Sequence, residues 1–319
     1  MSAEPAPQAT YREARAPDLY AAFRVSELAI HDTAQGMGLM GPAPLSEERI
    51  EREWRLRRPL LEFIAAKPEG KWWICERDGE PIGHGRVCRF GAMEQLTELM
   101  VLPGEHGSGI GRALLGRLWP DDPTPDLGRV VIAAGANADL SLYAGFGAMP
   151  ATGHWHLRGA TPEYGVRRAQ EIDARDPSAH VLEPARAVAE WRRLEPPAIA
   201  HRRPLLHEFF GRTRTCLATM SPDAAQATAL CWVGPDGEIG PAVARTPEEL
   251  VPVVLQALDR VAKTLEPESL ALYCSTDAWW LLRRLRRLGF RVWWPSWVMS
   301  SIPLPGLDRY LPTRPPYLL

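Results

Sequence analysis

The stretch Leu96–Trp119 constrains the fold of this chain more than any other part of the sequence. Its apolar beginning favours a β-strand over Leu96–Leu102, and Pro103 ends that strand because proline cannot donate to a ladder. Glycines recur through the next residues, and apolar side chains then return at helical spacing from Ala113 onward. A strand, a glycine-rich turn and a helix in this order form an anion site. The first amides of the helix have no partner within it, and its dipole favours negative charge.

Two well-known nucleotide-binding motifs do not fit this turn. The phosphate loop of the NTPases needs Gly-Lys followed by Ser or Thr, whereas Gly111 is followed by Arg112 and Ala113. The dinucleotide fingerprint, Gly-x-Gly-x-x-Gly/Ala, needs a small residue at its last position. That position is Arg112 if the motif starts at Gly107 and Leu114 if it starts at Gly109. The turn therefore belongs to another class of anion-binding loop.

The segment Val101–Gly111 resembles the acetyl-CoA pyrophosphate loop of the GNAT superfamily of N-acetyltransferases, usually written Gln/Arg-x-x-Gly-x-Gly/Ala. His106 stands where the family has Gln or Arg. The resemblance implies that backbone amides of the loop bind acetyl-CoA, the expected cofactor. It identifies the cofactor-binding residues as Met100, Val101, His106, Gly107, Ser108, Gly109, Ile110, Gly111, Arg112 and, from a later motif, Asn137.

That later motif, Asn137–Ala148, resembles the family element Asn-x-x-Ala-x-x-Leu-Tyr-x-x-x-Gly-Phe. Tyr143 and Gly147 fit it, Ala148 replaces the final Phe, and Asn137 lies one position later than the pattern relative to Tyr143. By resemblance, Tyr143 protonates the departing CoA sulfur, which a tyrosine of ordinary pKa can do as a hydrogen-bond donor. The alternative interpretation is that Tyr143 is a half-buried aromatic side chain of this helix.

Attack by an amine on a thioester also needs a group that removes the proton of the amine. Glu98 is the first candidate, because it lies on the motif strand on the same face as Met100. His84 and Glu94 are weaker candidates, and a plain solvated strand carboxylate is the alternative role for Glu98. No cysteine lies within these motifs, which favours direct attack over a covalent acyl-enzyme.

Composition narrows the classes of partner. A chain of 319 residues with 45% hydrophobic and 24% charged residues is an ordinary globular protein of about two domains. Its formal net charge of -2, without basic runs interleaved with aromatics, argues against a nucleic-acid partner. No stretch is apolar and long enough to span a membrane, and the first residues do not have the pattern of a signal peptide. The scattered cysteines predict buried thiols in a cytoplasmic protein; they are Cys75, Cys88, Cys216, Cys231 and Cys274.

The first half of the chain has the element order of a GNAT domain. Ser46 is expected to cap a helix that Pro59 kinks or divides, and Asp78-Gly79 predicts a hairpin turn. By resemblance to GNAT proteins, the segment Gly36–Pro44 is a candidate acceptor loop. The remaining expected elements are strands over Thr10–Ala14, Lys71–Glu76, Pro81–Phe90, Arg129–Ala134 and Met149–Leu157, and a helix over Asp18–Thr33.

The second half repeats this order without the glycine loop. Between a strand over Ile239–Ala244 and a helix capped by Thr246, no Gly-x-Gly segment can hold a pyrophosphate. We therefore expect a GNAT domain over residues 1–160, a polar link at Arg158–Glu163, and a degenerate GNAT-like domain over 161–319. The proline-rich tail Pro303–Leu319 is expected to form an extended arm on the surface. The other expected elements are helices over Pro184–Leu194, Arg202–Phe210 and Asp277–Leu288, and strands over Thr213–Met220, Thr228–Val233, Ser269–Cys274 and Val292–Met299.

The sequence thus predicts a mixed α/β fold of two tandem GNAT-like domains, each a twisted, mostly antiparallel sheet flanked by helices. The expected function is transfer of an acetyl group from acetyl-CoA to a primary amine of a small molecule. Two alternatives stay open: a non-catalytic CoA-binding or sensing module, and transfer to the amine of a protein or peptide. Nothing in the sequence decides against a homodimer.

Overall fold

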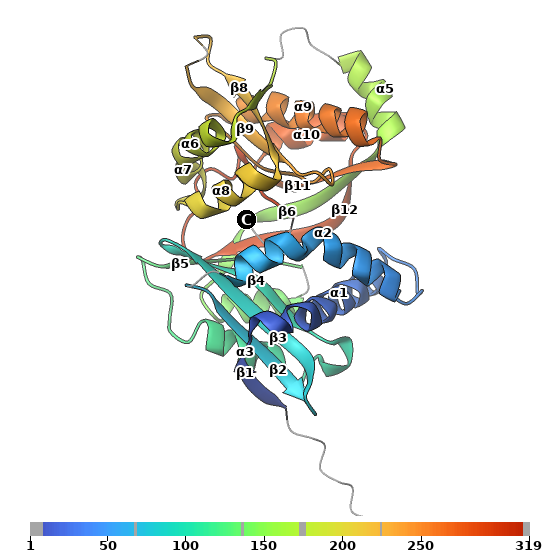
Figure 1. The fold of residues 1–319 in the computed structure, drawn as a ribbon, viewed down its shortest axis with the longest axis vertical. Helices are drawn as coiled ribbons and strands as arrows, with labels where there is room; N and C mark the ends of the chain where they lie inside the picture. The colour runs from blue at the N-terminus through green and yellow to red at the C-terminus, as the bar shows by residue number, and fades with distance from the viewer. Residues whose placement is uncertain (1–8, 67–68, 135–136, 172–176, 224, 315–319) are drawn as a thin grey trace, which may run out of the picture. The chain divides into compact units, whose positions relative to one another are not determined.

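The computed structural model describes residues 9–66, 69–134, 137–171, 177–223 and 225–314, which form two compact units (Figure 1). The first unit comprises the described residues up to Arg89 together with Glu94–Thr124, and the second comprises Phe90–Met93 with the described residues from Pro125 onward. Helices flank a sheet in each unit, which confirms the predicted α/β class. The predicted boundary between residues 160 and 161 was placed where the order of elements begins to repeat. The two units are compact groups in space, so they do not test that boundary.

The first unit has strands that are neighbours in the order β1-β2-β3-β4. The Asp78-Gly79 turn between β2 and β3 is confirmed, since both residues have the positive φ (52° and 81°) that a two-residue hairpin turn requires. The elements are β1 (Thr10–Glu13), η1 (Ala16–Asp18), α1 (Leu19–Gly36), α2 (Glu47–Ala65), β2 (Lys71–Arg77), β3 (Glu80–Phe90), β4 (Met93–Val101), η2 (Pro103–Glu105) and α3 (Ile110–Leu118).

Helix α2 differs from its prediction at one residue. Ser46 caps it as expected, accepting a hydrogen bond of 3.3 Å from the amide of Arg49. Pro59 does not divide the helix, which continues to Ala65. Pro59 is exposed, whereas Ile50 before it and Leu61 after it are buried. Packing of the apolar face on both sides of the proline therefore outweighs the one hydrogen bond that proline cannot donate.

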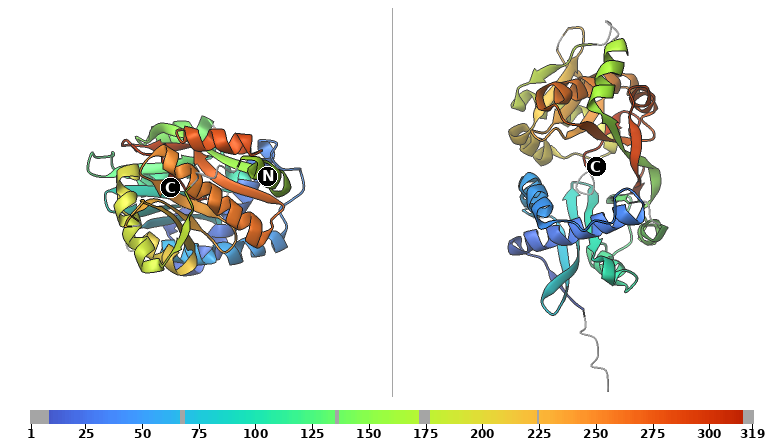
Figure 2. Two further views of the ribbon diagram at one scale, coloured as in Figure 1. Left: turned by 90° about the horizontal axis from the view of Figure 1, so that it is seen from above. Right: turned by 90° about the vertical axis from the view of Figure 1, so that its right-hand side faces the viewer.

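The second unit contains two sheets, with strand orders β5-β12-β6-β11 and β13-β10-β9-β8-β7. Helix α9 packs against β8, β9, β10 and α10 (Figure 2). The elements are β5 (Gly128–Ala133), α4 (Asn137–Ala144), β6 (Met149–Ala160), α5 (Thr161–Glu171), β7 (His180–Leu182), α6 (Pro184–Leu194), α7 (Pro196–Ile199), α8 (Pro204–Thr213), β8 (Thr215–Met220), β9 (Ala227–Val233), β10 (Ile239–Ala244), α9 (Pro247–Leu265), β11 (Ser269–Ser275), α10 (Trp279–Arg287), β12 (Arg291–Ser300) and β13 (Tyr310–Leu311).

The last long strand of the chain, β12, lies between two strands of the first half. It pairs antiparallel with β5 on one side and with β6 on the other, and β6 in turn pairs with β11. In the repeat, β5 corresponds to β11 and β6 corresponds to β12. If each strand is replaced by its counterpart, the order β5-β12-β6-β11 becomes the same order read from the other end. The two halves of the repeat are therefore interleaved at their final strands, where His154 of β6 lies opposite Ser296 of β12.

The ends of α4 and α10 show the same repeat in atomic detail. Gly147 and Gly289 both take a positive φ (86° and 91°) in the turns that follow α4, which ends at Ala144, and α10, which ends at Arg287. The next amide bonds back in each case, Ala148 to the carbonyl of Tyr143 at 3.1 Å and Phe290 to that of Leu285 at 3.0 Å. Both helices thus end with the left-handed glycine that closes many helices.

Two expectations about irregular segments were wrong. The residues expected to form a polar link, Arg158–Glu163, instead complete β6 and begin α5. The proline-rich tail is no surface arm where it is described, because Tyr310 and Leu311 are fully buried and pair with β10. Burial of these two apolar side chains in the second sheet explains the difference. Residues 315–319 of the tail lie outside the described part of the chain.

The cysteines are all buried and unbridged, as the sequence predicted. Among the described residues, no helix combines the length and the apolar character needed to cross a membrane.

Candidate functional site

The glycine-rich loop begins α3 without any side-chain cap. Gly109 is the N-cap residue, with φ of 88°, and within the described part of the chain no side chain accepts a hydrogen bond there. Gly107 also has a positive φ, 78°, and at both glycines the space that a Cβ would occupy is empty to 4 Å. The backbone between His106 and Gly109 is exposed. A negatively charged group can therefore approach the free amides at the start of α3 without meeting a side chain.

Residues on both sides hold this loop in place. The Nε2 atom of His106 lies 3.0 Å from the carbonyl oxygen of Val101, so the imidazole donates to the end of β4. The hydroxyl of Ser108 donates to the carbonyl of Glu105 at 2.6 Å, and the carboxylate of Glu105 pairs with Arg77 of β2. The predicted loop residues thus form one continuous feature from Met100 and Val101 of β4 to Ile110, Gly111 and Arg112 of α3.

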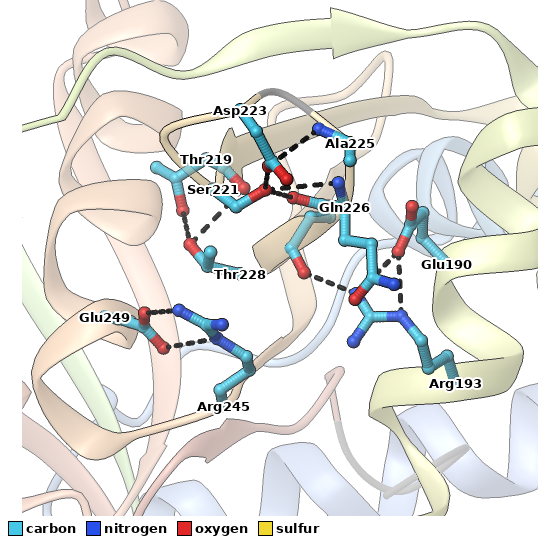
Figure 3. A network of polar contacts seen from close by, with 11 residues as sticks. Glu190, Arg193, Thr219, Ser221, Asp223, Ala225, Gln226, Thr228, Arg245 and Glu249 are labelled. Carbon is cyan, nitrogen blue, oxygen red and sulfur yellow. Dashed lines mark hydrogen bonds and ion pairs between the residues drawn. The ribbon is translucent and has the colours of Figure 1, made fainter.

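The corresponding start of α9 in the second half is closed. Thr246 is its N-cap and accepts a hydrogen bond of 3.4 Å from the amide of Glu249. Glu248 and Glu249 lie in its first turn, and Glu249 also pairs with Arg245 at 2.6 Å (Figure 3). The chain's own hydroxyl and carboxylates therefore take the place that an external anion would need.

Glu98 lies in a buried polar cluster of the first unit. Its Oε2 atom is 3.0 Å from Nε of Arg86, and the side chains of both residues are at most 3% exposed. Its Oε1 atom accepts from the hydroxyl of Ser26 at 3.4 Å, and the same hydroxyl lies 2.8 Å from Nε2 of His84. These side chains come from three elements, since Ser26 is on α1, His84 and Arg86 are on β3, and Glu98 is on β4.

The electrostatics of this cluster keep His84 neutral. Burial, together with the charge of Arg86, lowers the pKa of His84 to about 4, while the charge of Glu98 and the backbone of Ala22 partly oppose the shift. At neutral pH the imidazole therefore has one N–H and one lone pair. Two candidates for the base, Glu98 and His84, are thus part of one cluster, whereas Glu94 is buried elsewhere on β4, with its Oε1 atom 3.5 Å from Nζ of Lys71.

The two remaining predicted residues, Tyr143 and Asn137, lie on α4 in the second unit. Tyr143 is 7% exposed, and its burial, assisted by the charge of Asp139, raises the pKa of the phenol above its usual range. The phenol is therefore protonated at neutral pH and can act as a donor. Asn137 is exposed at the beginning of the same helix.

Two members of the buried cluster were not among the predicted site residues. Ser26 interrupts an apolar helix face made by Ala22, Phe23 and Ala29, and Arg86 is a charged residue in a buried strand, two positions after His84. Such polar residues on apolar faces are the signal that could have identified them, because a buried polar group needs partners.

Comparison with known proteins supports acyl transfer as the chemistry. Residues 68–147 match the family model of the acetyltransferase (GNAT) domain, a range that includes the glycine-rich loop and Tyr143. A search of curated proteins found no match. The family match therefore rests on the segment that carries the predicted site.

Solved structures share the fold over nearly the whole chain. A candidate acetyltransferase from Pyrococcus horikoshii is 15% identical with a TM-score of 0.69, covering 95% of this chain and 92% of its own. A tandem GNAT protein from the clavulanic acid biosynthesis pathway is 14% identical with a TM-score of 0.58, covering 93% and 99%. A GCN5-related N-acetyltransferase from Sphaerobacter thermophilus is 17% identical with a TM-score of 0.57, covering 95% and 99%. Residues 68–147 therefore match the GNAT acetyltransferase domain, and the chain as a whole shares its fold with a tandem GNAT protein.

Proposed function

We propose that this protein transfers an acetyl group from acetyl-CoA to the primary amine of a small molecule by direct attack. The observation that carries the proposal is the uncapped, glycine-opened start of α3 within the segment that matches an acetyltransferase domain. Anions bind at such helix starts through free amides and the helix dipole, and the pyrophosphate of CoA is an anion of this kind.

The residues of the loop fit this ligand. Gly107 and Gly109 leave the backbone accessible, and Arg112, exposed in the first turn of α3, adds a positive charge. Acetyl-CoA would supply an acyl thioester that an amine can attack. Met100 and Val101, half-buried at the end of β4, would hold the pantetheine arm through their backbone, and Asn137 would contribute from α4.

Two side chains would handle protons. Glu98 would take up the proton that the attacking amine loses, and Tyr143, kept protonated by its burial, would donate to the departing sulfur. Every cysteine is buried and none lies in the loop, which supports direct attack rather than a covalent acyl-enzyme. The descriptions of the tandem GNAT protein and of the N-acetyltransferase with the same fold also support an amine as acceptor.

Calorimetric titration with acetyl-CoA tests the proposal. We expect one site per chain for the natural sequence. We expect Gly109→Glu to weaken binding on the order of 1,000-fold, because a carboxylate near the pyrophosphate costs about 4 kcal/mol at an effective dielectric constant near 20. The matched control is Gly116→Glu, a glycine of α3 with equally open space but near the C-terminal end of the helix.

Activity is then measured as release of free CoA thiol with acetyl-CoA and a panel of amines, namely an aminoglycoside, a polyamine, an amino acid and a short peptide. Acetylation of a small amine, abolished in Gly109→Glu and retained in Gly116→Glu, is the expected result. Absence of acetyl-CoA binding would refute the proposal. Binding without turnover would instead support a sensing module, and turnover with the peptide alone would support a peptide acceptor.

A further inference from the structure

The hydroxyl of Ser26 has more possible acceptors around it than it has hydrogens to donate. Its oxygen is 3.2 Å from the carbonyl of Ala22, 3.4 Å from Oε1 of Glu98 and 2.8 Å from Nε2 of His84. A carbonyl and a carboxylate can only accept, and a serine hydroxyl has a single proton. The hydroxyl of Ser26 can therefore donate its hydrogen to one of these two oxygens only if it accepts a hydrogen bond from the imidazole of His84.

This requirement fixes the proton on His84. The shortest of the three contacts is satisfied when Nε2 has the hydrogen and donates to the oxygen of Ser26. The lone pair of the neutral ring then lies on Nδ1. Nδ1 is buried and has no hydrogen-bond partner among the described residues. An unpaired buried acceptor is costly, so this nitrogen is the position of the neutral ring at which a hydrogen-bond donor would be stabilised.

We propose that His84, Ser26 and Glu98 form a proton relay that removes the proton of the acceptor amine. The amine loses a proton as its N–H bond breaks, and a new N–H bond forms at Nδ1 of His84. The hydrogen on Nε2 passes to the oxygen of Ser26, and the hydrogen of Ser26 passes to Oε1 of Glu98. One proton is moved in total, and the carboxylate becomes a carboxylic acid. After the product leaves, the same transfers run in reverse and Nδ1 releases a proton to solvent, which restores the hydrogen on Nε2.

Arg86 acts in this relay as a positioning residue. Its Nε atom contacts Oε2 of Glu98, the oxygen that does not face Ser26, so the pair fixes the orientation of the carboxylate. Its guanidinium also stacks on Trp72, with a distance of 4.2 Å to the ring centroid. The ion pair, together with this stacking, keeps Oε1 directed at Ser26.

The relay rests on the proposed function, and the first experiment separates it from that function. Steady-state rates of thiol release are measured with acetyl-CoA and the amine that the natural sequence acetylates. Ser26→Ala is expected to lower kcat about 100-fold, within the range of general acid–base effects, with little change in KM. Ser26→Thr retains the hydroxyl and should restore kcat to within a few-fold.

The hydroxyl of Thr33, about two helical turns further along α1, provides a matched control. Thr33 of α1 donates to the carbonyl of Ala29, four residues back, and the hydroxyl oxygen of Ser26 stands in the same relation to the carbonyl of Ala22, at 3.2 Å. Thr33→Ala removes the same kind of bond away from His84 and should leave kcat unchanged. Equal losses in Ser26→Ala and Thr33→Ala would show a structural effect on α1 and overturn the relay.

Nitrogen-15 NMR of histidine-labelled protein tests the relay without any substrate. His84 is assigned by the signal lost in His84→Gln and should show the neutral ring with hydrogen on Nε2. Hydrogen on Nδ1 would overturn the relay, whatever the activity. If the natural sequence acetylates amines and Ser26→Ala retains full kcat, only the relay fails. If the natural sequence binds no acetyl-CoA, both the proposed function and the relay are wrong.

Discussion

Helices α3 and α9 follow strands at the same place in the two halves of this protein, yet they begin in different ways. Helix α3 starts at Gly109 with no side-chain cap, and the loop before it is exposed. Helix α9 starts at Thr246, whose side chain caps it, and Glu248 and Glu249 occupy its first turn. One helix start is open to an external anion and the other is satisfied by the chain itself.

The two helices also differ in how much they contribute to their core. Helix α9 has 19 residues, and its buried positions include Leu255 and Leu258 at 0% exposure. Helix α3 has 9 residues and fewer buried positions. The difference indicates that a repeated element can keep its packing role while its start is closed to an external anion. We therefore expect ligand binding to depend on the half that contains α3 and stability to depend more on the half that contains α9.

The largest expected effect concerns the packing role of α9. Leu258→Ala removes a fully buried side chain and should lower the free energy of unfolding by about 3 kcal/mol, measured by urea denaturation. The acetyl-CoA affinity of the folded protein should not change. Leu265→Ala, at the half-exposed end of the same helix, should stay within about 0.5 kcal/mol. A loss of affinity in Leu258→Ala would mean that the two roles are not separate.

Acid should affect the unit that contains α9 through its buried histidines. Burial, aided by the charges of Arg158 and Arg314, lowers the pKa of His156 to about 2, so the folded protein keeps this ring neutral. The unfolded chain takes up a proton near the ordinary pKa of 6.5, and stability contributed by the neutral ring is therefore lost as the pH falls below that value.

His156→Phe tests this directly. The new ring retains the stacking on Tyr273, where the centroids are 4.3 Å apart, but cannot titrate. The variant should be about 2 kcal/mol more stable than the natural sequence at pH 5, relative to their difference at pH 8. Thermal unfolding at both pH values measures this, with the exposed His180→Gln as a control that should show no such change. A difference independent of pH would contradict the assignment.

A smaller effect should distinguish the two helix starts by charge. Arg112→Glu places a negative charge in the first turn of α3 and should weaken acetyl-CoA binding about 10-fold, less at high salt. Arg245→Glu, next to the start of α9, should leave the affinity unchanged. Equal effects at both positions would indicate that both halves bind the ligand.

The smallest effect concerns capping itself. Thr246→Ala removes the side chain that caps α9 and should cost about 0.5–1 kcal/mol in urea denaturation. Ser108→Ala, just before α3, should cost less, because the hydroxyl of Ser108 donates to Glu105 and does not cap the helix. A larger loss in Ser108→Ala would show that α3 depends on a cap that the structure does not have.

Local features were predictable because their causes lie within a few residues. The Asp78-Gly79 turn, the Ser46 and Thr246 caps and the end of β4 next to Pro103 all follow from the conformational limits of those residue types. The glycine-rich loop was likewise found from its spacing. Pro59 was misjudged because the packing on either side of it, rather than the residue itself, decides whether α2 continues.

The sequence by itself determined the order of most strands and helices, the repeat and the face of β4 on which Glu98 lies, whereas α5, β7 and α7 were not predicted. Only the tertiary structure decided that β12 pairs between β5 and β6, that the tail adds β13 to β10, and that Glu98 meets Arg86 and Ser26. Alternation along a strand gives the face of a side chain but not its partner. Partners come from segments far apart in the chain, whose pairing depends on the packing of the whole core.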